Sequence, residues 1–238
     1  MLYIISALCM TAFYIGVILS MGRMRSTKLW NGVFAASIFM FYLNVVISIY
    51  LDAGLYDWNF QNTLPAANVS PFMFVLTPLL CLLPSAIKKH LRFLITLLSV
   101  GMFLAAVVGC AYNAAIGYKF HPHFICDYMA HVLLSLWGVY FVKSKQVEPK
   151  FKNALISAGI IFSVALCMLL CNVALDTAFF GLSLNGKHNI YNVIVTDNSY
   201  LSAALYFAGL SLVLSLGFAY ARVLAKDRLL GKRKGVAP

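Results

Sequence analysis

The sequence predicts an all-α fold: a polytopic transmembrane bundle of seven helices, with the N-terminus outside and the C-terminus in the cytoplasm. Composition predicts the membrane. Of the 238 residues, 62% are hydrophobic and only 11% are charged, whereas a soluble domain averages about 25% charged residues. The mean hydropathy of +0.87 is too high for a surface that must face water. A third observation, the distribution of basic residues along the chain, predicts the orientation.

Seven apolar segments come close to the roughly 20 residues that a helix needs to cross a bilayer. They are residues 2–21, 33–51, 71–87, 93–114, 124–142, 154–175 and 201–221. The first segment has basic residues after its apolar run and none before it. We therefore interpret it as a retained helix and not as a signal peptide.

Basic residues gather in every second connection between these segments and in the stretch after the last one. Sixteen of the eighteen Lys and Arg residues lie on one side of the predicted membrane, and only Lys119 and Lys187 lie on the other. The positive-inside rule places the crowded side in the cytoplasm. We expect residues 1–221 to form one transmembrane domain and residues 222–238 a basic cytoplasmic tail. Its position beside the membrane favours anionic lipid headgroups over nucleic acid as its partner.

The third segment is rich in proline, with Pro65, Pro71, Pro78 and Pro84 recurring along it. Each proline removes a backbone donor and frees a carbonyl. Inside a membrane such a carbonyl must be satisfied by protein or by water in a cavity. The segment is therefore either a kinked helix or a broken helix that lines a cavity.

Small residues recur at intervals of four in two segments. One series is Gly101, Ala105 and Gly109, and the other is Gly159, Ser163, Cys167 and Cys171. Small residues let helix backbones approach closely, so we expect both series to lie at helix–helix contacts. The six cysteines lie mostly in apolar runs and do not indicate a disulfide framework.

The stretch "HPHFICDYMAH", residues 121–131, gathers ionisable groups at the outer end of the fifth segment. Asp127 and His131 are four residues apart, so they share one face of a helix. A carboxylate beside an imidazole favours one tautomer and raises its basicity, as an acid–base pair requires. Because ionisable groups are costly in lipid, we expect both to face the bundle interior. The alternative is a structural pair that holds this helix to its neighbours.

Other polar residues fall near the same depth. The candidates for ligand binding are Asn68, Asn113, Asn172 and Asp176. They would line a cavity that opens outward between the third and sixth segments. His121 and His123 offer zinc-type ligands beside Asp127 and His131. Their spacing matches no familiar zinc pattern, so we expect neither a metal nor a cofactor and keep the two histidines as an alternative.

Three short motifs resemble the YwaF-type family of bacterial integral membrane proteins. They are Leu64-Pro65, the stretch "DYMAHVLLSLWGVYFV" and the stretch "CNVALDTAFF". The family is distantly similar to animal membrane acyltransferases and lipid hydrolases. The resemblance implies lipid acyl chemistry in a bacterial plasma membrane. In it, His131 matches a characteristic histidine and Asn172 lies near a characteristic asparagine.

This chain departs from the family pattern where a cysteine is expected after Leu-Pro, because its sequence there is "LPAANVS". If the acyl chemistry is retained, Ser70 is the candidate nucleophile, with His131 as its base and Asp127 as the group that orients the base. Two other functions stay open. The same groups would bind or transport a small polar or lipidic ligand, or they would form a structural network in a non-catalytic subunit with a membrane-protein partner.

Overall fold

The computed structural model describes residues 1–24, 26–51, 68–80, 83–117, 119–182, 184 and 198–226. Within these ranges the fold is all-α, with two short 3-10 turns and no strand. Leu64, Pro65 and the tail beyond residue 226 lie outside the described residues. The described part confirms the all-α fold class.

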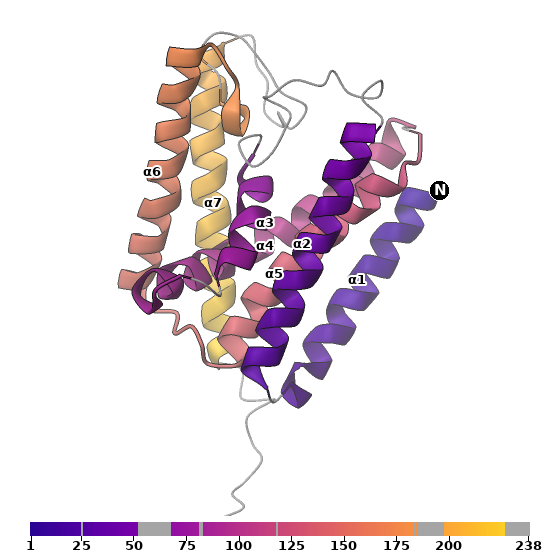
Figure 1. The fold of residues 1–238 in the computed structure, drawn as a ribbon, viewed down its shortest axis with the longest axis vertical. Helices are drawn as coiled ribbons and strands as arrows, with labels where there is room; N and C mark the ends of the chain where they lie inside the picture. Colours follow the sequence, from indigo (N-terminus) through magenta and orange to yellow (C-terminus); the bar gives the residue numbers. More distant parts are fainter. Residues whose placement is uncertain are drawn as a thin grey trace, which may run out of the picture.

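Within the described residues, seven α-helices form the bundle. They are α1 (Leu2–Ser20), α2 (Thr27–Leu51), α3 (Val69–Leu79), α4 (Ser85–Ala115), α5 (Pro122–Lys143), α6 (Phe151–Leu175) and α7 (Ser199–Lys226), with the 3-10 turns η1 (Met21–Arg23) and η2 (Phe179–Gly181). In Figure 1, α1 and α2 lie on one side, α6 and α7 on the other, and α3, α4 and α5 between them. Six of the helices are long and apolar enough to cross a membrane. The chain therefore fits a multi-pass integral membrane protein.

The expected seven long spans are reduced to six because the third segment does not form one helix. We expected it to cover residues 71–87, but α3 ends at Leu79 and has only 11 residues. Pro84 is the N-cap of α4. A proline without a backbone N–H interrupts a helix interior but is tolerated where a helix begins. As a result residues 88–92, expected in a loop, lie in the first turns of α4, together with residues 85–87, which were expected to end the third span.

One end of the bundle gathers the beginnings of α2, α4 and α6 and the end of α5. The Asn31 amide near the start of α2 donates to Oε1 of Gln146, just after α5, at 2.8 Å. The Ser157 hydroxyl of α6 donates to the backbone carbonyl of His90 in α4 at 3.2 Å. We call this the basic end. Its described Lys and Arg residues are Arg23, Lys28, Lys88, Lys89, Arg92, Lys143, Lys145, Lys150, Lys152, Arg222 and Lys226.

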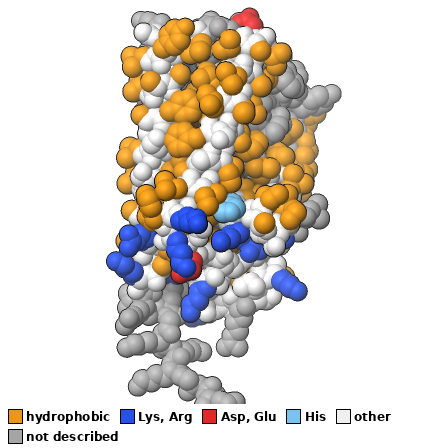
Figure 2. Space-filling view, turned by 90° about the vertical axis from the view of Figure 1, so that its left-hand side faces the viewer, with side chains coloured by type: hydrophobic (Ala, Val, Ile, Leu, Met, Phe, Trp, Pro, Cys, Tyr) orange, Lys and Arg blue, Asp and Glu red, His pale blue; other side chains and the backbone are white. Residues whose placement is uncertain are grey.

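The opposite end brings together the start of α1, the connection from α4 to α5, and the segment after α6. The Tyr3 hydroxyl donates to the Lys119 carbonyl at 3.0 Å. Phe72 of α3 packs edge-on against Phe180 of η2, with ring centroids 5.6 Å apart. The seven described helices therefore alternate in direction along the chain, and α2, α4 and α6 all begin at the basic end. Figure 2 shows Lys and Arg gathered below a broad hydrophobic band, which is the arrangement expected of a membrane-spanning bundle.

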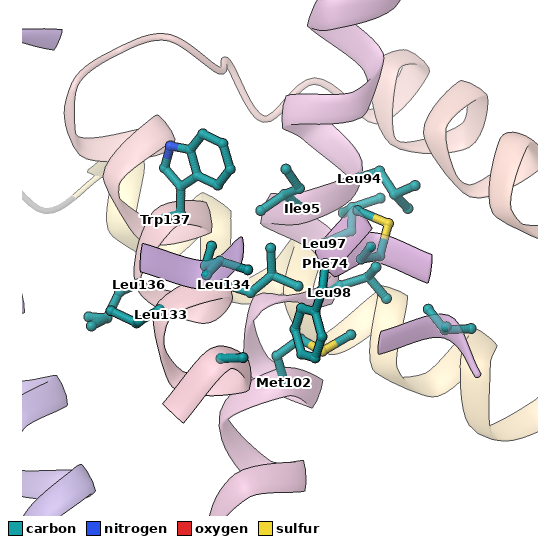
Figure 3. Packing of buried hydrophobic residues seen from close by; sticks show 14 of the residues in the cluster. Phe74, Leu94, Ile95, Leu97, Leu98, Met102, Leu133, Leu134, Leu136 and Trp137 are labelled. Atoms are coloured by element: carbon teal, nitrogen blue, oxygen red, sulfur yellow. The ribbon is translucent and has the colours of Figure 1, made fainter. Parts of the chain in front are cut away.

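The core lies around α4 and α5, which are the most buried of the long apolar helices. Figure 3 shows Phe74 of α3 against the leucines of α4, and Trp137 of α5 beside Ile95. Gly138 permits the close approach of α5 to α4, since a Cβ there would lie 2.8 Å from the Ile95 carbonyl oxygen. Gly217 does the same for α7, where a Cβ would collide with the Leu97 backbone. At both positions the absence of a side chain lets the helices come into close van der Waals contact.

The two series of small residues have different outcomes. In α4, an added Cβ at Gly101 would meet Val213 of α7, and one at Gly109 would lie 2.7 Å from the Tyr128 ring of α5, whereas Ala105 is exposed. The expectation of helix contact was wrong for α6. There all four residues of the series are exposed, and nothing lies within 4 Å of a Cβ built on Gly159. The face that α6 buries instead carries Ala154, Ser157, Ile161 and Ala165.

Candidate functional site

Asp127 and His131 lie on one face of α5, inside the bundle. The His131 residue is 8% exposed, and the Asp127 side chain is 16% exposed. His131 Nδ1 lies 2.8 Å from the backbone carbonyl oxygen of Asp127 and 3.7 Å from its carboxylate Oδ1. The hydrogen bond that orients the imidazole is therefore made to the Asp127 backbone, and the carboxylate lies beyond hydrogen-bond distance.

This contact determines the histidine tautomer. A carbonyl oxygen only accepts hydrogen bonds, so Nδ1 must carry the proton. In the neutral imidazole, Nε2 is then an unprotonated acceptor. Within the described part of the chain Nε2 makes no hydrogen bond. A base oriented by its other nitrogen, with its reactive nitrogen unengaged, is the arrangement that general base catalysis requires.

Two aromatic side chains from other helices complete the surroundings. Phe74 of α3 is fully buried and meets the His131 ring edge-on, with centroids 4.9 Å apart. Tyr42 of α2 packs on Phe74 at 5.5 Å. The pair on α5 is thus enclosed by α2 and α3, and we call Tyr42, Phe74, Asp127 and His131 the α2–α3–α5 cluster.

Ser70, the expected nucleophile, is half-buried in the first turn of α3. It precedes Phe74 by four residues, so it shares the α3 face that meets His131 and lies one turn farther from the basic end. Its hydroxyl makes no hydrogen bond within the described residues. The structure therefore places Ser70 on the side of the α2–α3–α5 cluster without a bond to His131.

Asn68 and Asn113 have structural roles at helix ends. Asn68 is the N-cap of α3, and its side chain accepts a hydrogen bond from the Val69 backbone N–H at 2.7 Å. The Asn113 amide of α4 donates to the Tyr128 hydroxyl of α5 at 2.9 Å. Asn113 is 8% exposed and therefore links α4 to α5 within the bundle.

Asn172 organises the turn that follows α6. Its Oδ1 accepts from the Thr177 hydroxyl at 2.8 Å and from the Phe179 backbone N–H at 2.7 Å. Its amide donates to the carbonyls of Phe179 and Leu182. Asp176, the C-cap of α6, is exposed with φ at 54°. Because both polar atoms of Asn172 are used inside this turn, the residue stabilises local structure.

The two remaining histidines of the stretch lie at the start of α5. His121 is its N-cap, and the His121 and His123 rings are 5.4 Å apart. Across the residues that the structure describes, no three His, Cys, Asp or Glu side chains form a group that could hold a metal ion. Cys126, next to Asp127, is half-buried and free, and Cys110 is buried and free. The candidate chemistry is therefore that of the α2–α3–α5 cluster.

Sequence reasoning missed Tyr42 and Phe74. No polar residue stands four positions from Tyr42, so α2 shows no pattern like that of Asp127 and His131. One signal was available, because Tyr42 lies well inside the span, whereas tyrosines that anchor a helix lie at the membrane interfaces. Phe74 has no sequence signal, since a phenylalanine in an apolar helix is ordinary.

No protein-family model matches this chain, and neither the curated proteins nor the solved structures include a match to it. The resemblance to the YwaF-type family stays a prediction from short motifs. What the chain does must therefore be argued from its own residues.

Proposed function

We propose that this protein catalyses acyl transfer or hydrolysis on a lipid ester within the membrane, with His131 as the general base. One observation carries the proposal. His131 is buried among helices, its Nδ1 is held by the Asp127 carbonyl, and its Nε2 is unengaged. The acyl substrate class follows from the resemblance to the YwaF-type family. The proposed location is a bacterial plasma membrane, with the cluster nearer its outer face.

In the proposed reaction, His131 Nε2 accepts the proton of a nucleophilic hydroxyl as its oxygen attacks the ester carbonyl carbon. The carbonyl oxygen becomes an oxyanion. The tetrahedral intermediate then expels the alcohol oxygen of the lipid, which takes the proton back from His131. The Asp127 carboxylate, 3.7 Å from Nδ1, offsets the positive charge that forms on the ring. Ser70 is the proposed nucleophile, with water as the alternative.

The test is turnover by the full chain in proteoliposomes that contain phosphatidylcholine with a fluorescent acyl chain. We expect His131→Asn to lower the rate of acyl release or transfer by roughly 10²- to 10⁴-fold, the contribution typical of a general base. His90→Asn is the matched control, because His90 lies at the basic end and its Nδ1 has no partner. It should keep the wild-type rate. Wild-type turnover in the His131 variant would refute the proposal.

A second measurement separates the two nucleophiles. A fluorophosphonate probe reacts covalently with an activated serine hydroxyl and not with water. Labelling that maps to Ser70 and is lost in His131→Asn would support acyl-enzyme formation. Full turnover in Ser70→Ala would leave water as the nucleophile.

Binding of a cationic ligand is a second candidate function, and one observation favours it. The Asp127 carboxylate makes no hydrogen bond within the described residues, and its recorded ion-pair partner is His131 at 3.7 Å. A carboxylate inside a membrane protein is costly unless it is paired. An amine would supply that pairing. Titration of the purified protein with n-hexylamine should show saturable binding that is lost in Asp127→Asn if this function is the correct one.

A further inference from the structure

Tyr42 is a buried tyrosine whose hydroxyl has no hydrogen-bond partner among the described residues. The residue is 5% exposed, and its hydroxyl oxygen is fully buried. Buried hydroxyls in native proteins nearly always have a partner, so an exception requires an explanation. A bound group that accepts its hydrogen bond would provide one.

The hydroxyl lies at the depth of the acid–base pair. Tyr42 is 15 residues after Thr27, about 22 Å along the axis of α2 from the basic end. Asp127 is 16 residues before Lys143, about 24 Å along α5 from the same end. Phe74 contacts both the Tyr42 ring and the His131 ring, with centroids 5.5 Å and 4.9 Å away, and so links Tyr42 to the pair on α5.

Two other tyrosines allow the effect of a tyrosine's position to be distinguished from the effect of its burial. The hydroxyls of Tyr140 and Tyr206 are also buried without a partner in the part of the chain that the structure describes. Tyr140 packs on Phe34 near the basic end and lies nine residues beyond His131 on α5. Of these three tyrosines, Tyr42 is the one that packs on Phe74, the ring that meets His131.

We infer that Tyr42 donates a hydrogen bond to the carbonyl oxygen of the bound ester, the oxygen that becomes the oxyanion. This inference rests on the proposed function and assigns it a further residue. The Tyr42 proton stays on its oxygen throughout, while His131 alone transfers a proton from the nucleophile to the leaving alcohol. Nucleophile, base and oxyanion donor then come from α3, α5 and α2, respectively. A hydroxyl already fixed by packing needs no reorganisation when the charge forms.

The experiment compares Tyr42→Phe with Tyr140→Phe in proteoliposomes with the same fluorescent phosphatidylcholine. Each change removes one unpartnered buried hydroxyl and keeps the ring. We expect Tyr42→Phe to lower kcat by roughly 10²-fold or more, as loss of one oxyanion donor does, and to change KM little. Tyr140→Phe should keep the wild-type kcat and KM.

The outcomes are distinguishable. Wild-type kcat in Tyr42→Phe, with His131→Asn inactive, would overturn the role of Tyr42 and leave the proposed function intact. Activity in His131→Asn, or no turnover by the wild-type protein, would overturn both. Thermal unfolding in detergent micelles provides a second measurement. Tyr42→Phe should unfold no earlier than Tyr140→Phe, because no native hydrogen bond is lost, and a markedly lower midpoint would identify a structural role instead.

Discussion

Some polar residues in this bundle have their hydrogen bonds satisfied within the described structure and others do not, and this difference separates structural residues from candidate functional ones. Asn172 uses both polar atoms of its side chain on the turn from Thr177 to Leu182. His131 uses only Nδ1, and the Tyr42 hydroxyl is unused. Since an unpaired buried polar group is destabilising, the free positions are the ones at which a ligand gains most by binding.

Asn172→Ala should destabilise the protein. It leaves the Phe179 N–H and the carbonyls of Phe179 and Leu182 without these hydrogen bonds, a loss of about 2 to 4 kcal/mol. Asn153→Ala is the control, because Asn153 lies on the same helix, is half-buried and makes no side-chain hydrogen bond. The measurement is the thermal unfolding midpoint in detergent micelles. An unchanged midpoint for Asn172→Ala would show that its four hydrogen bonds contribute little.

At the scale of helices, close contacts depend on glycine placed where two backbones meet. Gly138 joins α5 to α4, and Gly217 joins α7 to α4. In lipid the hydrophobic effect does not drive helices together, so van der Waals packing at such positions contributes much of the association. Gly159, in contrast, lies on an exposed face of α6 with open space beside it.

Gly217→Ala should therefore be harmful, and Gly159→Ala should not. The added methyl at residue 217 would collide with the Leu97 backbone, which can move only if α4 moves. Overpacking of this kind typically costs about 1 to 3 kcal/mol. At residue 159 the methyl enters open space, and alanine favours the helix over glycine. Unfolding midpoints of both variants in detergent micelles check the contrast, and equal midpoints would contradict the close contact of α7 with α4.

At the scale of the whole molecule, charge is divided between the two ends. Among the described residues, eleven Lys and Arg side chains belong to the basic end, and Lys119 lies at the other. A bundle with this asymmetry is expected to insert with its basic end in the cytoplasm. The α2–α3–α5 cluster would then be nearer the outer face.

Cysteine accessibility tests this orientation in a variant without the six native cysteines. A cysteine at Lys145, exposed at the basic end, should react with a membrane-impermeant maleimide only after the cells are opened. A cysteine at Lys119, exposed at the opposite end, should react in intact cells and serves as the control. The reverse pattern would invert the orientation.

The sequence alone determined most of the helices and the alternation of basic residues between their connections. Hydropathy and charge are properties of short segments, so they can be read without the tertiary structure. Five of the seven expected spans agree with α1, α2, α5, α6 and α7 to within six residues at each end. The spacing of Asp127 and His131 also placed them on one helix face. Tertiary structure decided which neighbours surround that face, which small residues are in contact, and where the proline-rich segment breaks. The physical reason is that lipid and protein core are equally apolar. An apolar pattern therefore cannot show which side of a helix is buried, and Tyr42 on α2 enters the site only through packing.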